Sequence, residues 1–445
     1  MLQSRTPERT DPRRRGPKPL VKSKPGQIGI ALAGGGPLGG IYEIGALAAL
    51  ADCLRGLDFN KLDVYVGVSS GSFVAAALAN GITPAQMSAM FIESDTAVEP
   101  FDPALLLKPA YYEYFRRAMS LPPLIISTMW RYLHAPFSVG LFDSLQRLGR
   151  AIPAGIFDGA HIDASLANVF SAPGRSNDFR KLKRKLYIVA TDLDTGQTVE
   201  FGAKGFDAVP ISTAVQASAA LPGLFPPVEI AGRHYADGAL KKTLHASVAL
   251  NHGAQLVLCI NPLVPFDAAR PTADMPVPQH LADGGLPAIL SQTLRTILHS
   301  RLEVGLEGYR TTYKDADLVL FEPNRYDAEM FFTNILSYSS RRRLAEHAYQ
   351  KTRDELRARH AELAPILAHH GIVIDMGAVD DSRSHLVDGV RPSNSGYGEW
   401  ISRTLNESLA DLQRWIRTSE SLNAAAIKPR RITAAQRKAR VKRAR

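Results

Sequence analysis

Short apolar runs alternate with segments of helical periodicity in the first part of the chain. Residues 28–33 and 61–66 are predicted strands, because each contains a run of apolar residues that includes β-branched side chains. Each run is followed by a helical pattern, over residues 41–57 and 73–80. Two strands that are each followed by a helix predict a βαβα unit with a parallel sheet.

The later part of the chain contributes further strands to the same sheet. The predicted strands lie at residues 186–191, 198–201, 228–230, 233–236, 254–260 and 318–321. The predicted helices lie at residues 210–220, 290–310, 339–370 and 397–417. We therefore expect an α/β fold with a mainly parallel central sheet and a helix-rich C-terminal part packed on it.

Charge is concentrated at the two ends of the 445-residue chain. The formal net charge is +10, but residues 1–25 carry +6 and residues 428–445 carry +9, so the remainder is mildly acidic. Residues 1–25 are rich in proline and arginine and cannot build a core, which predicts a disordered basic arm. The two basic ends suit contact with an anionic membrane surface, with solvated, disordered ends as the alternative, and we expect no nucleic-acid partner.

Cysteine usage and the N-terminal pattern bear on the compartment. Two cysteines, both in apolar segments, exclude a disulfide framework and favour a reducing compartment. Prolines interrupt the basic N-terminus, so no secretory signal peptide can be read there. No run of 18 apolar residues occurs. The expected location is the cytoplasm, as a soluble protein or on the inner face of a membrane.

The central motif is Gly-Val-Ser-Ser-Gly at residues 67–71, between a predicted strand and a helix of small residues. In this context a Gly-x-Ser-x-Gly sequence is typical of a nucleophile elbow, where glycines allow strand and helix to approach and a strained turn exposes the serine. Ser69 is therefore the predicted nucleophile. The alternative is an ordinary glycine-rich turn.

A second glycine-rich loop, residues 34–39, follows the first predicted strand. Consecutive glycines leave backbone N–H groups free at a helix N-terminus, where they can stabilise a developing oxyanion. The loop also matches a dinucleotide-binding pattern, but no acidic residue clearly ends the second strand to bind a ribose. A phosphate-binding loop would continue with Lys-Ser or Lys-Thr, whereas Gly40-Ile41 follows the last of these glycines. Paired with the elbow, this loop is interpreted as an oxyanion hole.

Three other segments have more than one interpretation. Residues 90–170 mix aromatic and basic residues, which fits a lid, a surface that enters lipid headgroups, or a helical cap on the core. Asp192 and Asp194 resemble a metal site in composition, but two carboxylates in a turn more often bond the local backbone. Asp237, followed by Gly238, is by itself typical of a turn.

Five segments, in this order and spacing, resemble the patatin-like phospholipase family. They are residues 34–39, 67–71, 190–196, 217–227 and 237–239. The resemblance covers about residues 27–262. It implies a patatin-like three-layer α/β/α domain with a mainly parallel central sheet and a C-terminal helical extension.

The resemblance also implies the chemistry. Ser69 would be the nucleophile, Asp237 its base, and the backbone amides of Gly34, Gly35 and Gly36 the oxyanion hole. The implied reaction is hydrolysis of fatty-acyl esters of phospholipids or lysophospholipids through an acyl-enzyme, with a lipid as substrate and with neither a cofactor nor a metal. One position departs from the family pattern, since Leu38 stands where Arg or Lys is usual.

The resemblance also suggests a division of the chain into four parts. They are a basic arm (1–25), a catalytic domain (26–265) with a lid or cap insertion (about 90–170), a helix-rich part packed on the same sheet (266–427), and a basic tail (428–445).

Two other functions remain open from the sequence. An α/β-hydrolase esterase would use a Ser-Asp-His triad, with a histidine after Asp237. A non-catalytic scaffold would use its basic ends to adhere to anionic lipid or nucleic acid. The candidate histidines are His245, His252, His280 and His299.

Overall fold

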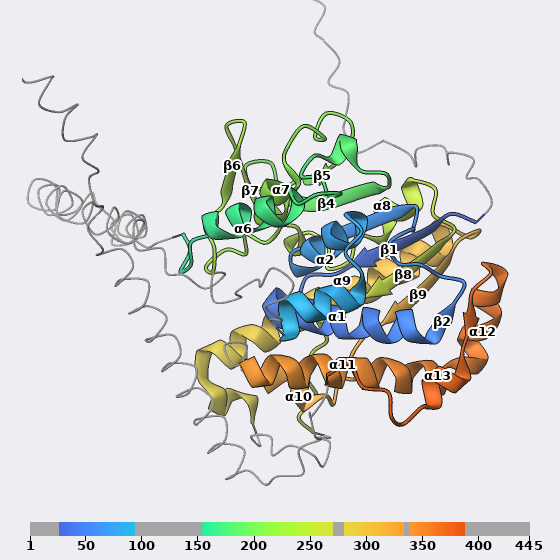
Figure 1. The fold of residues 1–445 in the computed structure, drawn as a ribbon. Helices are drawn as coiled ribbons and strands as arrows, with labels where there is room; N and C mark the ends of the chain where they lie inside the picture. The colour runs from blue at the N-terminus through green and yellow to red at the C-terminus, as the bar shows by residue number, and fades with distance from the viewer. Residues whose placement is uncertain (1–25, 94–153, 270–279, 333–337, 388–445) are drawn as a thin grey trace, which may run out of the picture.

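The computed structural model describes residues 26–93, 154–269, 280–332 and 338–387 (Figure 1). The predicted basic arm and basic tail, the predicted helix at 397–417 and most of the 90–170 insertion lie outside these ranges. The division into four parts therefore stays a prediction.

An eight-stranded sheet forms the centre of the described chain. Five strands run parallel in the order β4, β3, β1, β8, β9, and the antiparallel strands β7 and β6 continue the sheet beyond β4, with β5 also paired to β4. The prediction of a mainly parallel α/β fold is confirmed. The strands are β1 (Ile28–Leu32), β3 (Val64–Val68), β4 (Lys185–Asp192), β5 (Thr198–Phe201), β6 (Val228–Ile230), β7 (Arg233–Asp237), β8 (Leu256–Ile260) and β9 (Asp317–Phe321).

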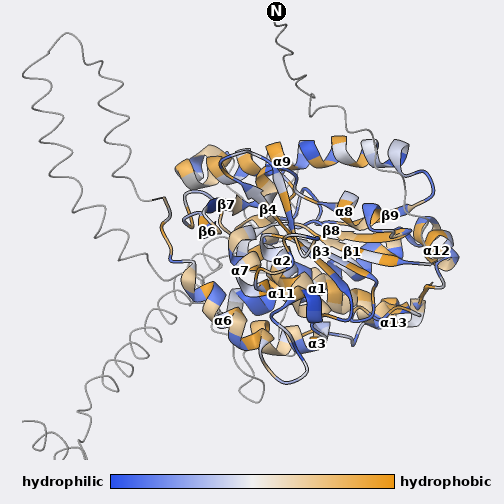
Figure 2. Ribbon diagram, turned by 90° about the horizontal axis from the view of Figure 1, so that it is seen from above, coloured by the Kyte–Doolittle hydropathy of each residue, from blue (hydrophilic) through white to orange (hydrophobic). Residues whose placement is uncertain are grey.

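Helices cover both faces of the sheet, as Figure 2 shows from above. One face is covered by α1 (Gly36–Cys53), α2 (Ser70–Ala79), α7 (Ile211–Ser218) and α11 (Tyr338–Ala358), and the other by α8 (Ala246–Asn251) and α9 (Gly285–Thr312). This arrangement confirms the predicted three-layer architecture. The other helices are α3 (Pro84–Met87), α6 (Ala160–Phe170), α10 (Ala328–Phe332), α12 (His360–His369) and α13 (Met376–Asp380).

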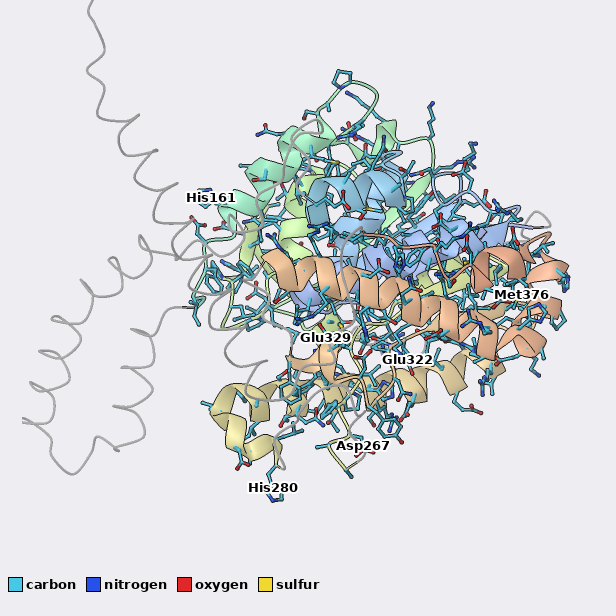
Figure 3. The ribbon with its side chains drawn as sticks, turned by 60° about the horizontal axis from the view of Figure 1, so that its bottom comes forward. His161, Asp267, His280, Glu322, Glu329 and Met376 are labelled. Carbon is cyan, nitrogen blue, oxygen red and sulfur yellow. The ribbon has the colours of Figure 1, made fainter. Side chains whose placement is uncertain are left out.

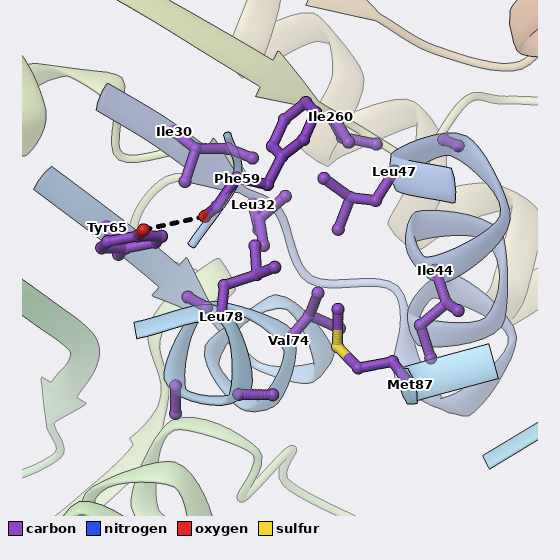
Figure 4. Packing of buried hydrophobic residues seen from close by; sticks show 14 of the residues in the cluster. Ile30, Leu32, Ile44, Leu47, Phe59, Tyr65, Val74, Leu78, Met87 and Ile260 are labelled. Atoms are coloured by element: carbon purple, nitrogen blue, oxygen red, sulfur yellow. Dashed lines mark hydrogen bonds between the residues drawn. The ribbon is translucent and has the colours of Figure 1, made fainter. Parts of the chain in front are cut away.

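Alternation along the strands builds two cores. In β1, Ile30 and Leu32 join the larger cluster, while Ala31 points to the opposite face and joins the smaller one. Figure 4 shows the larger cluster, where Tyr65 packs among aliphatic side chains and its hydroxyl donates to the Phe59 carbonyl at 2.8 Å. A buried polar group is thus satisfied inside an apolar layer.

The C-terminal helices pack directly on the first helix. A Cβ atom at Gly45 of α1 would lie 2.4 Å from the carbonyl oxygen of Ala345 in α11, so the two helices approach more closely than any other residue would allow. Farther along, β10 (Val373–Ile374) pairs antiparallel with β2 (Leu54–Arg55). In addition, β9 extends the main sheet from within the C-terminal part.

The predicted bounds of the first helix were wrong at both ends. It begins at Gly36 rather than residue 41, because proline is favoured in the first turn of a helix and the Gly39 N–H already donates to the Gly35 carbonyl at 3.0 Å. It ends at Cys53 rather than residue 57, because Leu54 turns to an extended conformation and pairs with β10. That pairing is a tertiary contact with no local signal.

Other bounds also shifted. The second strand is Val64–Val68 rather than 61–66, so it continues through Gly67 to the elbow. The stretch 339–370, predicted as helical throughout, forms two helices that break at Arg359. Among the described residues, no helix has the combination of length and apolar character that crossing a membrane requires.

Candidate active site

The strand register brings Ser69 and Asp237 to the same place from opposite sides of β4. Val68 pairs with Val189 across β3 and β4, and Ala190 pairs with Asp237 across β4 and β7. Ser69 directly follows Val68, so the serine and the aspartate flank the same point of β4. Neighbouring strands are about 4.8 Å apart, so side chains can meet over the intervening strand.

Ser69 occupies a strained turn between β3 and α2. Its φ of 52° and ψ of −125° lie outside the regions that L-residues favour, and among the described non-glycine residues only Ala231 shares a positive φ. Both motif glycines are required by space, since a Cβ at Gly67 would lie 2.4 Å from the Gly71 carbonyl oxygen and one at Gly71 would lie 2.6 Å from that of Ala33. This is the geometry of a nucleophile elbow.

Hydrogen bonds hold the strained turn in place. The Ser69 N–H donates to Ser218 Oγ at 2.8 Å, and that hydroxyl donates in turn to the Val189 carbonyl at 2.6 Å. The Ser72 hydroxyl donates to the Ser69 carbonyl at 2.5 Å. Sequence reasoning gave Ser218 no role, although a buried serine in a helix of small residues was the available signal.

Asp237 lies at the end of β7 with 2 % of its surface exposed. Its carboxylate accepts a hydrogen bond at 2.8 Å from the N–H of Ala239. A Cβ at Gly238 would lie 2.3 Å from the Val189 carbonyl oxygen, so the residue after the aspartate has to be glycine. The Asp-Gly-Ala sequence is therefore part of the packing at β4 as well as a turn.

Burial raises the pKa of Asp237 to about 6, although the nearby Ser69 side chain and the hydrogen bond from the Ala239 N–H act in the opposite direction. The carboxylate is therefore mostly ionised at pH 7, yet it is more basic than an exposed aspartate. Such a group can accept a proton from a serine hydroxyl.

The glycine-rich loop at residues 34–39 lies beside Ser69. A Cβ at Gly34 would lie 2.9 Å from Ser69 Cβ, so only glycine fits beside the nucleophile. A Cβ at Gly35 would lie 2.6 Å from Pro262 Cγ, and Gly36 has a φ of +61°. Because α1 begins at Gly36, the N–H groups of its first turn have no carbonyl partner within the helix. The predicted oxyanion residues thus lie next to the predicted nucleophile.

Leu38 has a structural role in this loop. Its half-buried side chain packs against the larger core cluster. The loop consequently offers backbone donors without a side-chain cation at this position.

Each of the four candidate triad histidines has contacts or a position that do not include the Asp237 carboxylate. His245 is buried with Nε2 3.4 Å from the Gly238 carbonyl oxygen, and burial lowers its pKa to about 4. His252 stacks on Tyr187, His299 contacts Arg325 at 2.8 Å, and Figure 3 shows His280 at the periphery. Within the described ranges, no histidine hydrogen-bonds to Ser69 or to the Asp237 carboxylate.

The acidic turn after β4 is structural. One oxygen of Asp192 accepts from the N–H groups of Asp194 and Thr195 at 3.0 and 3.1 Å, and the other lies 3.1 Å from Arg233. The expected bonding to the local backbone is confirmed for Asp192, whereas the Asp194 carboxylate lies 3.8 Å from His234 Nδ1.

The decisive comparison is with protein families: the family model described as patatin-like phospholipase matches residues 30–250. This chain carries a patatin-like phospholipase domain. The match spans the elbow, the glycine-rich loop at residues 34–39 and Asp237, which are the parts that the structure brings together.

Three individual proteins are also similar. An uncharacterized protein, R571 of Acanthamoeba polyphaga mimivirus, is 27% identical over 221 residues, which are 50% of this chain and 60% of that protein. VipD from Legionella pneumophila has a TM-score of 0.38 at 17% identity, covering 76% of this chain and 68% of VipD. The type III effector ExoU, from Pseudomonas aeruginosa, has a TM-score of 0.32 at 19% identity, and the match covers 77% of this chain and 55% of ExoU. The chain thus spans about three fifths of its mimiviral relative.

We predict that ester hydrolysis by this patatin-like domain rises with pH through an apparent pKa near 6, because the base must be ionised. For an acid whose folded pKa is raised, the contribution to stability is present below the unfolded pKa and is lost as the pH rises through the folded value. The gain in activity therefore does not reflect a gain in folding. The measurement is kcat/KM for a soluble short-chain ester between pH 4.5 and 8.5, with circular dichroism at each pH. A flat profile across pH 5 to 7 in folded protein would contradict the assignment.

Proposed function

We propose that the protein is a serine lipid acyl hydrolase that cleaves fatty-acyl esters of phospholipids or lysophospholipids through a Ser69–Asp237 dyad. The observation that carries the proposal is the position of a serine in a strained elbow across one strand from a buried aspartate whose pKa is raised. The family match supports a lipid substrate.

In the first half of the proposed reaction, Ser69 Oγ attacks the ester carbonyl while Asp237 takes the hydroxyl proton. The carbonyl oxygen becomes an oxyanion, which the backbone N–H groups of Gly34, Gly35 and Gly36 stabilise. The tetrahedral intermediate then expels the alcohol, which leaves with the proton from Asp237. The product is an acyl-enzyme on Ser69.

In the second half, Asp237 takes a proton from a water molecule that attacks the acyl-enzyme. A second tetrahedral intermediate forms at the same oxyanion site. Its collapse releases the fatty acid and returns the proton from Asp237 to Ser69 Oγ. One buried carboxylate thus serves as base and acid in both halves, without a histidine.

The triad alternative is weakened by the positions of the histidines described above. The scaffold alternative gives no reason for the elbow strain, because a merely structural turn would be more stable with glycine at residue 69. The triad and the scaffold each predict a different effect of point substitutions on activity than the dyad does.

We predict that Ser69→Ala and Asp237→Asn each lower kcat/KM for phospholipid vesicles and for a short-chain ester by about 10³-fold or more. Ser70→Ala is the matched control, since this neighbouring hydroxyl is buried and has no hydrogen-bond partner among the described residues. It should retain activity within about threefold of the unsubstituted protein. Released fatty acid is measured by mass spectrometry.

His245→Ala, His252→Ala, His280→Ala and His299→Ala complete the test. Activity within about tenfold of the unsubstituted protein is expected for each folded variant. If one histidine variant abolishes turnover while its circular dichroism is unchanged, the triad replaces the dyad.

We also propose that the basic ends, residues 1–25 and 428–445, hold the enzyme at an anionic membrane surface. Their charges of +6 and +9 suit attraction to anionic lipids, which salt should weaken. Deleting both ends should reduce binding to phosphatidylserine vesicles, measured by cosedimentation, while turnover of a soluble short-chain ester stays unchanged. Equal vesicle binding by full-length and truncated protein would contradict this role.

A further inference from the structure

A second group of chemically active side chains lies far from the dyad. Asp317, His369 and His370 each offer one ligand atom, and these atoms all lie within 4.8 Å of one another. The sequence shows no metal-binding motif here, because Asp317 is more than fifty residues from the histidines.

The position of this group separates it from the reaction. Asp317 is the first residue of β9, in register with Leu256 of β8, and therefore lies at the amino edge of the parallel sheet. Ser69 follows the carboxyl end of β3, about 16 Å away along the strand direction alone. Figure 1 shows α12 at the opposite end of the molecule from α6.

The existing contacts hold the ligands in place. His370 Nε2 lies 2.8 Å from an Asp317 oxygen, and only 5% of the histidine side chain is exposed. The His369 and His370 rings stack with centroids 5.0 Å apart and an interplanar angle of 14°. The Asp317 N–H donates to the Gln255 carbonyl at 2.7 Å, which fixes the strand end.

The local electrostatics favour a cation. His369 ends α12, and the last turn of a helix carries partial negative charge on its carbonyl groups. Gly371 follows with a φ of +75° and ends the helix sharply, so both imidazoles remain beside the strand. Asp317 adds a full negative charge that is 38% exposed, which leaves a path for an ion to enter.

We propose that Asp317, His369 and His370 bind a divalent transition-metal ion, for which zinc is the best match. Two imidazoles and one carboxylate are a common zinc ligand set, completed by a water molecule. Ligand atoms around tetrahedral zinc are about 3.3 Å apart, so the group needs side-chain adjustments of about 1 Å. The ion would link α12 to the edge strand of the sheet and stabilise the docking of the C-terminal helices.

The test is zinc titration of the full-length protein after chelator treatment, by isothermal titration calorimetry at pH 7.5. One saturable equivalent and a higher unfolding temperature with zinc are expected. His369→Ala and His370→Ala should each weaken binding at least tenfold and abolish the thermal shift. His360→Ala, in the first turn of the same helix and outside the group, is the matched control and should bind as the unsubstituted protein does.

Because His369 is exposed, its replacement should leave the unfolding temperature of the metal-free protein unchanged, which separates loss of a ligand from loss of the fold. Absence of saturable binding at 100 μM zinc would overturn the proposal. Equal binding by His369→Ala and the unsubstituted protein would overturn it as well.

Discussion

The backbone conformation of Ser69 is the constraint on which the site depends. A positive φ at a residue with a side chain costs roughly 1–3 kcal/mol, so neighbouring contacts have to hold it. Here those contacts are the two motif glycines, the Ser218 hydroxyl and the start of α2. The same contacts set the position of β4, because Ser218 also bonds to Val189. The Ser69 turn, helix α7 and strand β4 are therefore linked by one chain of hydrogen bonds.

Burial sets the basicity of Asp237. Asp237 would have little basicity in water, but burial raises its pKa to about 6, against the lowering effect of Ser69 and of the Ala239 N–H. The loop of residues 34–39, which we propose as the oxyanion hole, contains no cationic side chain, and Leu38 packs against the larger core cluster. In the proposed mechanism the site relies on backbone N–H groups and on desolvation. In a buried pocket such fixed dipoles are worth more than they would be in solution.

Much of this arrangement could be predicted from the sequence because its signals are local. The glycines around Ser69 and the apolar runs of β1 and β8 specify their own conformations, and the order of these segments indicated the family. Other features depend on contacts between distant residues. The end of α1 at Cys53 follows from pairing with β10, more than 300 residues later. The contact between Ser218 and Ser69 depends on the packing of α7 beside the elbow. The proximity of Asp317 to His369 and His370 depends on the position of β9 in the sheet.

The most direct test of the central claim is covalent trapping of the nucleophile with a fluorophosphonate probe. As the Ser69 oxygen attacks phosphorus, fluoride leaves and Asp237 takes the hydroxyl proton. Peptide mass spectrometry should find one adduct per chain, on Ser69, with labelling at least a hundredfold slower in Asp237→Asn and absent in Ser69→Ala. An adduct on a different serine, or equal labelling rates in the unsubstituted protein and Asp237→Asn, would contradict the account.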